Sequence, residues 1–221
     1  MSPPTLRNCP GDVEYEEREQ VNRPYIAFEG IEGAGKSTVA QWVGARLEAD
    51  GLRVVRVREP GGTTVGESIR QILLSHELAP EPWTEALLFA AARAQLAAEV
   101  VGPALDDGAW VLSDRSVYSS LAYQGAGRRL GIEEVRSANE PGLLGVWPSM
   151  VVLLAVDPDE GLARQEVGDR IGDEGVHFQH TVAEGFAALA AAEPERFVTI
   201  NTHVPIDEVV EKVYQEIRAR W

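Results

Sequence analysis

The chain has 221 residues and a hydrophobic fraction of 44%, which fit one soluble α/β domain with a sizeable core. A formal net charge of -15 argues against a nucleic-acid-binding surface, because such a surface needs clustered positive charge. The only cysteine is Cys9, no apolar run reaches membrane-spanning length and the N-terminus lacks a signal-peptide pattern, so we expect a cytoplasmic protein without disulfides or membrane contact.

The first part of the chain differs from the rest. It contains several prolines and a run of charged residues, but no apolar periodicity. Such a composition cannot bury enough apolar surface to fold alone, so residues 1–24 are predicted to be a disordered tail. Residues 25–221 are predicted to form the folded domain.

A phosphate-binding loop follows the first predicted strand, 25–28. The loop fits the Walker A pattern G-x-x-x-x-G-K-[ST], and a helix is predicted directly after it, over 38–50. Glycines let the backbone approach phosphate oxygens, and the N–H groups at a helix N-terminus attract anions. This strand–loop–helix context favours a nucleotide site over a chance glycine-rich turn. The loop residues predicted to bind ATP are Gly30, Ile31, Glu32, Gly33, Ala34, Gly35, Lys36, Ser37 and Thr38.

Strands and helices alternate along the rest of the chain. Further strands are predicted at 53–57, 110–113, 150–156 and 197–200, and helices at 64–74, 83–105, from about 116, 132–144, from 157, 176–192 and 205–220. This alternation predicts an α/β fold with a parallel sheet covered on both faces by helices. The polar, glycine-containing segment 164–175 is predicted to be a mobile lid.

Several residues outside the loop are candidates for chemistry. Asp114 directly follows a predicted strand, where an acidic residue beside a P-loop can hold a metal ion. Phe89 and Arg93 are four residues apart and hence share a helix face. Arg70 and Tyr123 are further candidates. All five residues have an ordinary alternative: Phe89 and Tyr123 as core residues, Arg70 and Arg93 as solvated helix charges, and Asp114 as a helix cap.

From residue 25 onward the chain resembles thymidylate kinases, a family of P-loop nucleoside monophosphate kinases. The resemblance depends on five motifs in the expected order, at 28–30 before the P-loop and at 58–63, 88–95, 114–125 and 169–171. It implies transfer of a phosphoryl group from ATP to dTMP with Mg²⁺, giving ADP and dTDP. It also implies the P-loop NTPase fold with a five-stranded parallel sheet, and a homodimer packed through helices.

The resemblance also implies individual roles. Catalysis is expected from Lys36, Asp114, Arg115 and Arg170, with Ser37 and Asp114 at the metal and Arg164 near the adenine or the outer phosphates of ATP. The residues expected to bind dTMP are Glu32, Arg58, Arg70, Phe89, Arg93, Arg115, Ser119, Ser120, Tyr123 and Gln124. The residue types suit these roles, because aromatic faces stack on bases and guanidinium forks match phosphate.

Three departures from the family pattern keep alternatives open. Ser116 follows the Asp-Arg pair where Tyr or His is usual, Thr181 stands where Arg or Lys is frequent, and the lid offers only Arg164 and Arg170. The P-loop has Gly33 where some relatives carry a catalytic arginine, so Arg170 is the expected substitute. A kinase for another or a modified pyrimidine monophosphate, or a nucleotide-binding regulator without transfer activity, would also fit.

Overall fold

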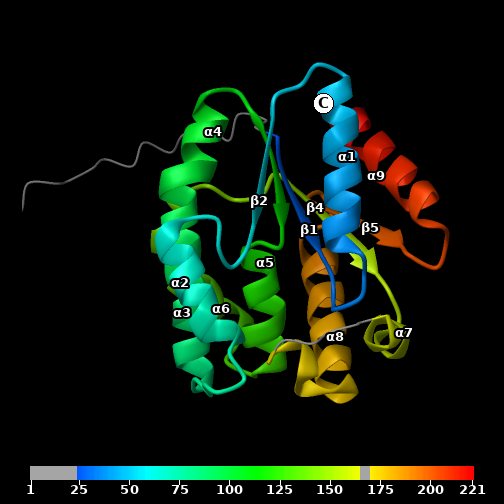
Figure 1. Cartoon of the computed structure of the whole chain (residues 1–221). Helices are drawn as coiled ribbons and strands as arrows, with labels where there is room; N and C mark the ends of the chain where they lie inside the picture. The colour runs from blue at the N-terminus through cyan, green and yellow to red at the C-terminus, as the bar shows by residue number, and fades with distance from the viewer. Residues whose placement is uncertain (1–23, 165–169) are drawn as a thin grey trace, which may run out of the picture.

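The computed structural model describes residues 24–164 and 170–221 (Figure 1). The predicted tail lies outside the described residues apart from Pro24, and so does Asp169 of the lid motif.

Five parallel strands form one sheet, in the order β2-β3-β1-β4-β5. They are β1 (Tyr25–Glu29), β2 (Val54–Arg58), β3 (Trp110–Asp114), β4 (Met150–Ala155) and β5 (Phe197–Asn201). Every residue of β1 is buried, as expected for a strand covered on both faces. The chain builds one side of the sheet and then the other around β1, so the loop after β1 lies at the topological switch point, where open α/β sheets bind ligands.

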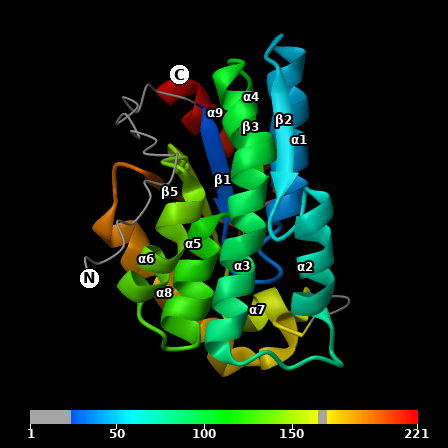
Figure 2. The ribbon, with the colours of Figure 1, turned by 90° about the vertical axis from the view of Figure 1, so that its left-hand side faces the viewer.

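Helices cover both faces of the sheet (Figures 1 and 2). On one face α1 (Lys36–Ala49) packs beside α9 (Ile206–Arg220), and the other face carries α3 (Pro82–Leu96), α5 (Val117–Ser120) and α6 (Ile132–Leu143). The remaining helices are α2 (Thr64–Leu74), α4 (Gly102–Asp106), α7 (Pro158–Ala163), α8 (Val176–Ala192) and the 3₁₀ turn Gly172–Glu174. The predicted fold class is confirmed.

Two long helices contain π-helical segments, which the sequence did not predict. The run from α3 to α4 passes through a π segment at Ala97–Val101, and α5 continues into a second one, η2 (Leu121–Gly127). A π turn shifts the following side chains around the helix axis and is often found at functional sites. The η2 segment carries Tyr123 and Gln124, and both are buried beside the site described below.

The helical run that begins with α3 corrects the expectation that no apolar run reaches membrane-spanning length. Pro82–Asp106 is long and apolar enough, by length and composition, to cross a membrane, and a third of its apolar window is buried in the protein. The core helix of a soluble protein can have the same composition. This run buries the charged side chains of Glu85 and Arg93 within the domain.

Most predicted ends agree with the structure, and one difference has a clear cause. Helix α1 begins at Lys36 rather than Thr38, because Gly35 takes the left-handed conformation (φ 84°) that ends the loop. In the segment predicted to be a lid, Ile171 and Gly172 are buried, whereas Arg164 and residues 173–175 are exposed. Its role as a lid stays a prediction.

Candidate active site

One cleft, with a volume of about 490 Å³, gathers most of the predicted site residues at the carboxyl ends of the strands. Those that line it are Glu32, Gly33, Gly35, Lys36, Ser37, Thr38, Arg58, Arg70, Phe89, Arg93, Asp114, Arg115, Ser119, Ser120, Tyr123 and Gln124. Four further lining residues, Glu59, Pro60, Leu74 and Ile171, were not predicted. Five of the lining side chains are cationic, so the cleft is suited to anions although the whole chain is acidic.

The P-loop is folded tightly by its glycines. Gly30 and Gly33 have φ angles of 140° and 74°, which side chains rarely adopt. A Cβ atom on Gly33 would lie 2.0 Å from the backbone oxygen of Gly161, so this position also allows α7 to pack directly on the loop. Ile31 and Ala34 are buried beneath the loop and do not line the cleft.

Lys36 is held over the P-loop. Its Nζ donates to the backbone oxygen of Ile31 at 2.8 Å, and only 7% of the residue is exposed. Burial, together with the nearby charge of Arg115, lowers the pKa of Lys36 to about 8. A bound polyphosphate would supply the negative charge that this buried ammonium lacks.

Ser37 and Asp114 meet at the end of the loop. The Ser37 hydroxyl donates to Asp114 Oδ2 at 2.5 Å. A hydroxyl and a carboxylate side by side fit Mg²⁺, which prefers oxygen ligands and few protein groups. Within 24–164 and 170–221 no three His, Cys, Asp or Glu side chains could hold a metal ion together. An ion here would therefore take its other ligands from phosphate and water.

Arg115 joins the P-loop to the helix on the opposite side of the cleft. Its backbone is left-handed (φ 71°), and its guanidinium forms an ion pair with Glu32 and donates to Ser119 Oγ at 3.2 Å. The same group lies 5.0 Å from the centre of the Tyr123 ring. The charge of Arg115 lowers the pKa of Glu32, and burial raises the pKa of Tyr123, so Glu32 is ionised and Tyr123 carries its proton at neutral pH.

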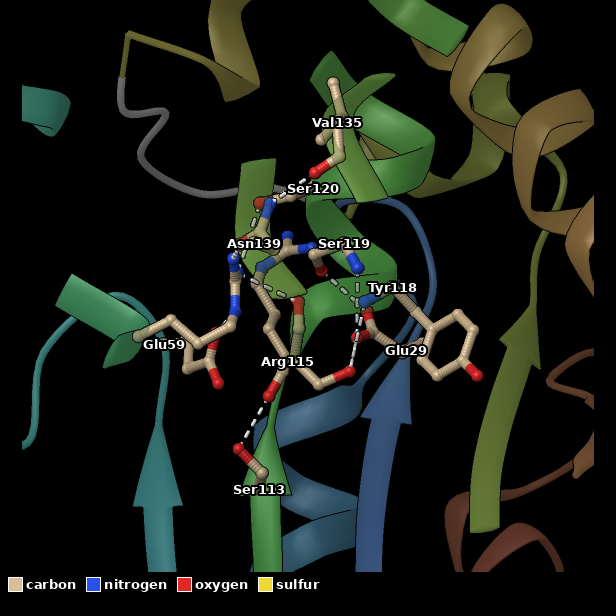
Figure 3. A network of polar contacts seen from close by, with 11 residues as sticks. Glu29, Glu59, Ser113, Arg115, Tyr118, Ser119, Ser120, Val135 and Asn139 are labelled. Atoms are coloured by element: carbon tan, nitrogen blue, oxygen red, sulfur yellow. Dashed lines mark hydrogen bonds and ion pairs between the residues drawn. The ribbon is translucent and has the colours of Figure 1, made fainter. Parts of the chain in front are cut away.

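Arg93 is fixed by a network that rules out a solvated helix charge. Its side-chain partners Glu59, Ser120 and Asn139 are labelled in Figure 3. Arg93 is 3% exposed, and its Nε donates to Glu59 Oε2 at 2.6 Å. One terminal nitrogen donates to Asn139 Oδ1, and the other donates to the Ser116 backbone oxygen (3.2 Å) and Ser120 Oγ (3.1 Å). Arginine has five N–H groups, so one remains without a partner among the described residues.

A second buried carboxylate, Glu29, was missed as a site residue although its motif was noticed. It accepts from Ser116 Oγ at 2.7 Å and from Ser119 Oγ at 2.6 Å. Glu29 and Ser119 are labelled in Figure 3. Burial raises the pKa of Glu29. The bond also explains the unusual Ser116, whose oxygen accepts from Tyr118 N–H as the cap of α5 while its hydroxyl donates to Glu29.

The two predicted lid arginines lie outside the cleft lining of the described structure. Arg164 pairs with Glu160 at 3.3 Å on the surface. Arg170 donates to Glu85 Oε2 at 2.6 Å and to the Leu73 backbone oxygen at 3.0 Å. Neither contact was predicted, because Glu85 and Leu73 are distant in sequence from the lid.

Three further predicted side chains, those of Arg58, Arg70 and Phe89, also line the cleft. Arg58 pairs with Glu67 at 3.1 Å, and Arg70 donates to the Pro60 backbone oxygen at 2.8 Å. Phe89 lines the cleft and also packs against the hydrophobic core, so its interpretation as a core residue holds in part, and its role in base stacking stays a prediction.

These features define a class of enzyme. A P-loop at the switch point, a hydroxyl–carboxylate pair beside it and further arginine and aromatic side chains in the same cleft are the parts of a P-loop nucleoside monophosphate kinase. The chain matches the thymidylate kinase family model over residues 28–213. It therefore belongs to the thymidylate kinase family.

Individual relatives agree with this assignment. The chain is 43% identical over 200 residues to the thymidylate kinase of Bacillus pumilus, covering 88% of this chain and 94% of that protein. It is 48% identical over 184 residues to that of Pelotomaculum thermopropionicum, covering 80% and 84%. The crystal structure of thymidylate kinase from Ehrlichia chaffeensis superposes with a TM-score of 0.73 at 30% identity, over 89% of this chain and 98% of the other.

Proposed function

We propose that this protein transfers the γ-phosphoryl group of ATP to dTMP, giving ADP and dTDP. One observation carries the proposal: the P-loop half and the cationic, aromatic half share one cleft, with the Glu32–Arg115 ion pair between them. Two nucleotides bound in these halves would bring their phosphates together, and holding reactants in line is the main part of phosphoryl-transfer catalysis.

The donor half binds ATP through the P-loop. Its N–H groups and the N-terminus of α1 bind phosphate oxygens, and Lys36 turns from Ile31 to the outer phosphates. Ser37 and Asp114 would hold Mg²⁺, which would supply positive charge beside the phosphates. Arg164 binds near the adenine or the outer phosphates when ATP is present.

The acceptor half binds dTMP. Arg58, Arg70 and Arg115 bind its phosphate as guanidinium forks. Phe89 stacks on the pyrimidine, and the remaining N–H of Arg93 donates to a base carbonyl.

Smaller polar groups complete the acceptor half. Ionised Glu32 accepts from the sugar hydroxyl, and the Tyr123 hydroxyl lies beside it. Ser119 and Ser120 line the same wall and position Arg115 and Arg93 through their hydroxyls.

Transfer itself needs positive charge near the moving phosphoryl group. Lys36 and Arg115 already lie in the cleft beside the P-loop. Arg170 adds its charge when its contacts with Glu85 and the Leu73 oxygen break as the site closes.

A second copy of the chain is the proposed partner. Helices α2 and α3 pack side by side, and each exposes large apolar side chains, Val65 (48%) and Ile72 (41%) on α2, and Trp83 (43%) and Leu87 (53%) on α3. Large apolar side chains exposed on two neighbouring helices are typical of a protein interface. Sedimentation velocity should give a dimer, and Leu87→Lys should shift it to a monomer.

The function is tested by a coupled assay of ADP release with a panel of nucleoside monophosphates. dTMP should be the best acceptor, and turnover should require Mg²⁺. Good turnover of another monophosphate with none of dTMP would overturn the acceptor assignment. Tight binding of ATP and dTMP without product would favour a nucleotide-binding regulator.

A further inference from the structure

A buried carboxylate lies behind the acceptor half of the cleft. Glu85 of α3 is 1% exposed. Its Oε1 accepts from Gln124 Nε2 at 2.9 Å and from Arg128 Nε at 3.1 Å, and its Oε2 accepts from a terminal nitrogen of Arg128 at 3.1 Å and of Arg170 at 2.6 Å. Three separate segments, η2, the residue after it and the lid, are thus joined to one carboxylate.

This carboxylate is charged. Burial raises the pKa of Glu85, but the hydrogen bonds from Arg128, Arg170 and Gln124 outweigh burial and place the pKa below its ordinary value. An ionised carboxylate can only accept hydrogen bonds. Glu85 therefore accepts a hydrogen bond from the NH₂ group of the Gln124 amide. It excludes the opposite orientation, in which the Gln124 carbonyl would face the carboxylate.

The fixed amide gives the cleft a defined pattern of hydrogen-bond donors and acceptors. Gln124 lines the cleft together with Phe89 and Arg93. Since its NH₂ group is turned to Glu85, its carbonyl Oε1 is the atom left for a ligand, and no donor from the described part of the chain contacts it. The cleft thus offers one acceptor, Gln124 Oε1, and one donor, the remaining N–H of Arg93.

We infer that Glu85 is a positioning residue that sets base specificity, because it holds Gln124 with its carbonyl toward the acceptor base. The inference rests on the proposed function, in which that base is a pyrimidine. Thymine and uracil carry an N3–H donor beside the O4 acceptor, which complements the Gln124 carbonyl and the Arg93 N–H. Cytosine has an acceptor at N3 and an amino group at C4, so both contacts would be mismatched, and unpaired polar groups in a closed site discriminate strongly.

Calorimetric titration of dTMP, dUMP and dCMP into three proteins tests the inference. Glu85→Gln keeps the shape but can both accept and donate, so the Gln124 amide is no longer fixed. We expect the preference for dTMP over dCMP to fall by roughly tenfold or more, the value of one hydrogen bond, while the preference for dTMP over dUMP stays unchanged, because both bases carry N3–H. Glu174→Gln is the matched control, since Glu174 pairs with Arg128 but does not contact Gln124. It should keep the parent preference.

Several results would overturn the inference. One is an unchanged dTMP-to-dCMP preference in Glu85→Gln; another is an equal loss of affinity for all three nucleotides, which would mean a purely structural role. Parent protein that binds dCMP as tightly as dTMP would also contradict it. These affinities are measured without ATP. A protein that keeps the binding preference but fails to phosphorylate dTMP would therefore contradict the proposed function and leave this inference standing.

A measurement on the parent protein covers the case in which Glu85→Gln does not fold. The side-chain amide protons of Gln124 can be assigned by NMR from their absence in Gln124→Leu. They should be protected from exchange by Glu85 both before and after dTMP binds. Loss of that protection on binding would show that the amide turns, and would overturn the inference.

Discussion

At the scale of single residues, buried charges determine how the cleft responds to ligand. Lys36 is buried in the P-loop with its ammonium on a backbone oxygen, and its pKa is lowered to about 8. Arg93 is also buried, but Glu59 and three other acceptors satisfy it. We therefore expect Lys36 to exchange its partner for phosphate and Arg93 to remain a fixed donor.

Removing the charge of Lys36 should separate catalysis from stability. Lys36→Met keeps the aliphatic stem but cannot neutralise a phosphoryl group, so kcat should fall by about 10²-fold or more. The melting temperature at pH 7 should not fall, because the buried ammonium is unfavourable in the absence of ligand. Stopped assays and a thermal melt on the same preparation measure both, and a melting temperature well below the parent's would contradict the assignment.

The pH dependence of ATP use should report the same residue. With a pKa of about 8 in the free protein, Lys36 is protonated below that pH and loses its proton as the pH rises through it. Since phosphate binding needs the ammonium, kcat/KM for ATP should be level at neutral pH and fall above pH 8. The free energy of unfolding changes with pH in the opposite direction. The unfolded chain holds this proton up to a higher pH, near the ordinary lysine pKa of 10.5, so the contribution of Lys36 to the free energy of unfolding rises between about pH 8 and pH 10.5.

At the scale of elements, the cleft depends on how loops and helices are joined. Helix α7 contacts the P-loop through two glycines, Gly33 and Gly161. The Glu32–Arg115 pair joins the loop to α5, and Glu85 joins α3 to η2 and to the lid. Each junction links segments that are far apart in the sequence, so a change at one of them should alter the others.

The junction between the P-loop and α7 can be tested with glycine substitutions. Gly33→Ala adds a Cβ that would lie 2.0 Å from the Gly161 oxygen, in a backbone conformation of φ 74°. Gly108→Ala is the matched control, since φ is 73° but nothing lies within 4 Å of the added atom. The control should lose about 1–2 kcal/mol of the free energy of unfolding. Gly33→Ala should lose clearly more and should also weaken ATP binding. Denaturant titrations with equal losses for both variants would show that the contact is unimportant.

The lid can be tested through its two arginines. If Arg170 leaves Glu85 during closure, Arg170→Ala removes a charge made available only in the transition state, and kcat should fall by about 10²-fold with a smaller change in KM for dTMP. Arg164→Ala should have a weaker effect, because Arg164 forms only an exposed pair with Glu160. Steady-state kinetics of both variants test this prediction. Parent-like turnover in Arg170→Ala would show that Arg170 pairs with Glu85 but does not contribute to catalysis.

At the scale of the whole molecule, one α/β domain carries both halves of the site. The sheet order places β1 between β3 and β4, so the P-loop and Asp114 meet at the carboxyl ends of β1 and β3. The match to the family model begins at residue 28 and does not include the residues before it.

We therefore expect the N-terminal segment to be dispensable. A protein that begins at Arg23 should keep kcat, and its KM for dTMP should stay within a few-fold of the parent value, because the sequence before it lacks the apolar residues needed to dock firmly. The assay is the same coupled measurement, with sedimentation velocity as a control for assembly. Lost activity in a folded, correctly assembled protein would mean that the segment contributes to the site.

The sequence by itself determined the fold class, the P-loop and most of the cleft lining. Those features depend on local signals: glycine spacing, strand–helix alternation and helix-face pairs such as Phe89 and Arg93. Only the tertiary structure decided which groups hold the site residues in place. Glu29, Glu59 and Glu85 do so through hydrogen bonds to partners that the fold brings close. A carboxylate that is buried and one that is solvated look alike in sequence, since burial and pairing across distant segments set both its charge and the groups it can orient.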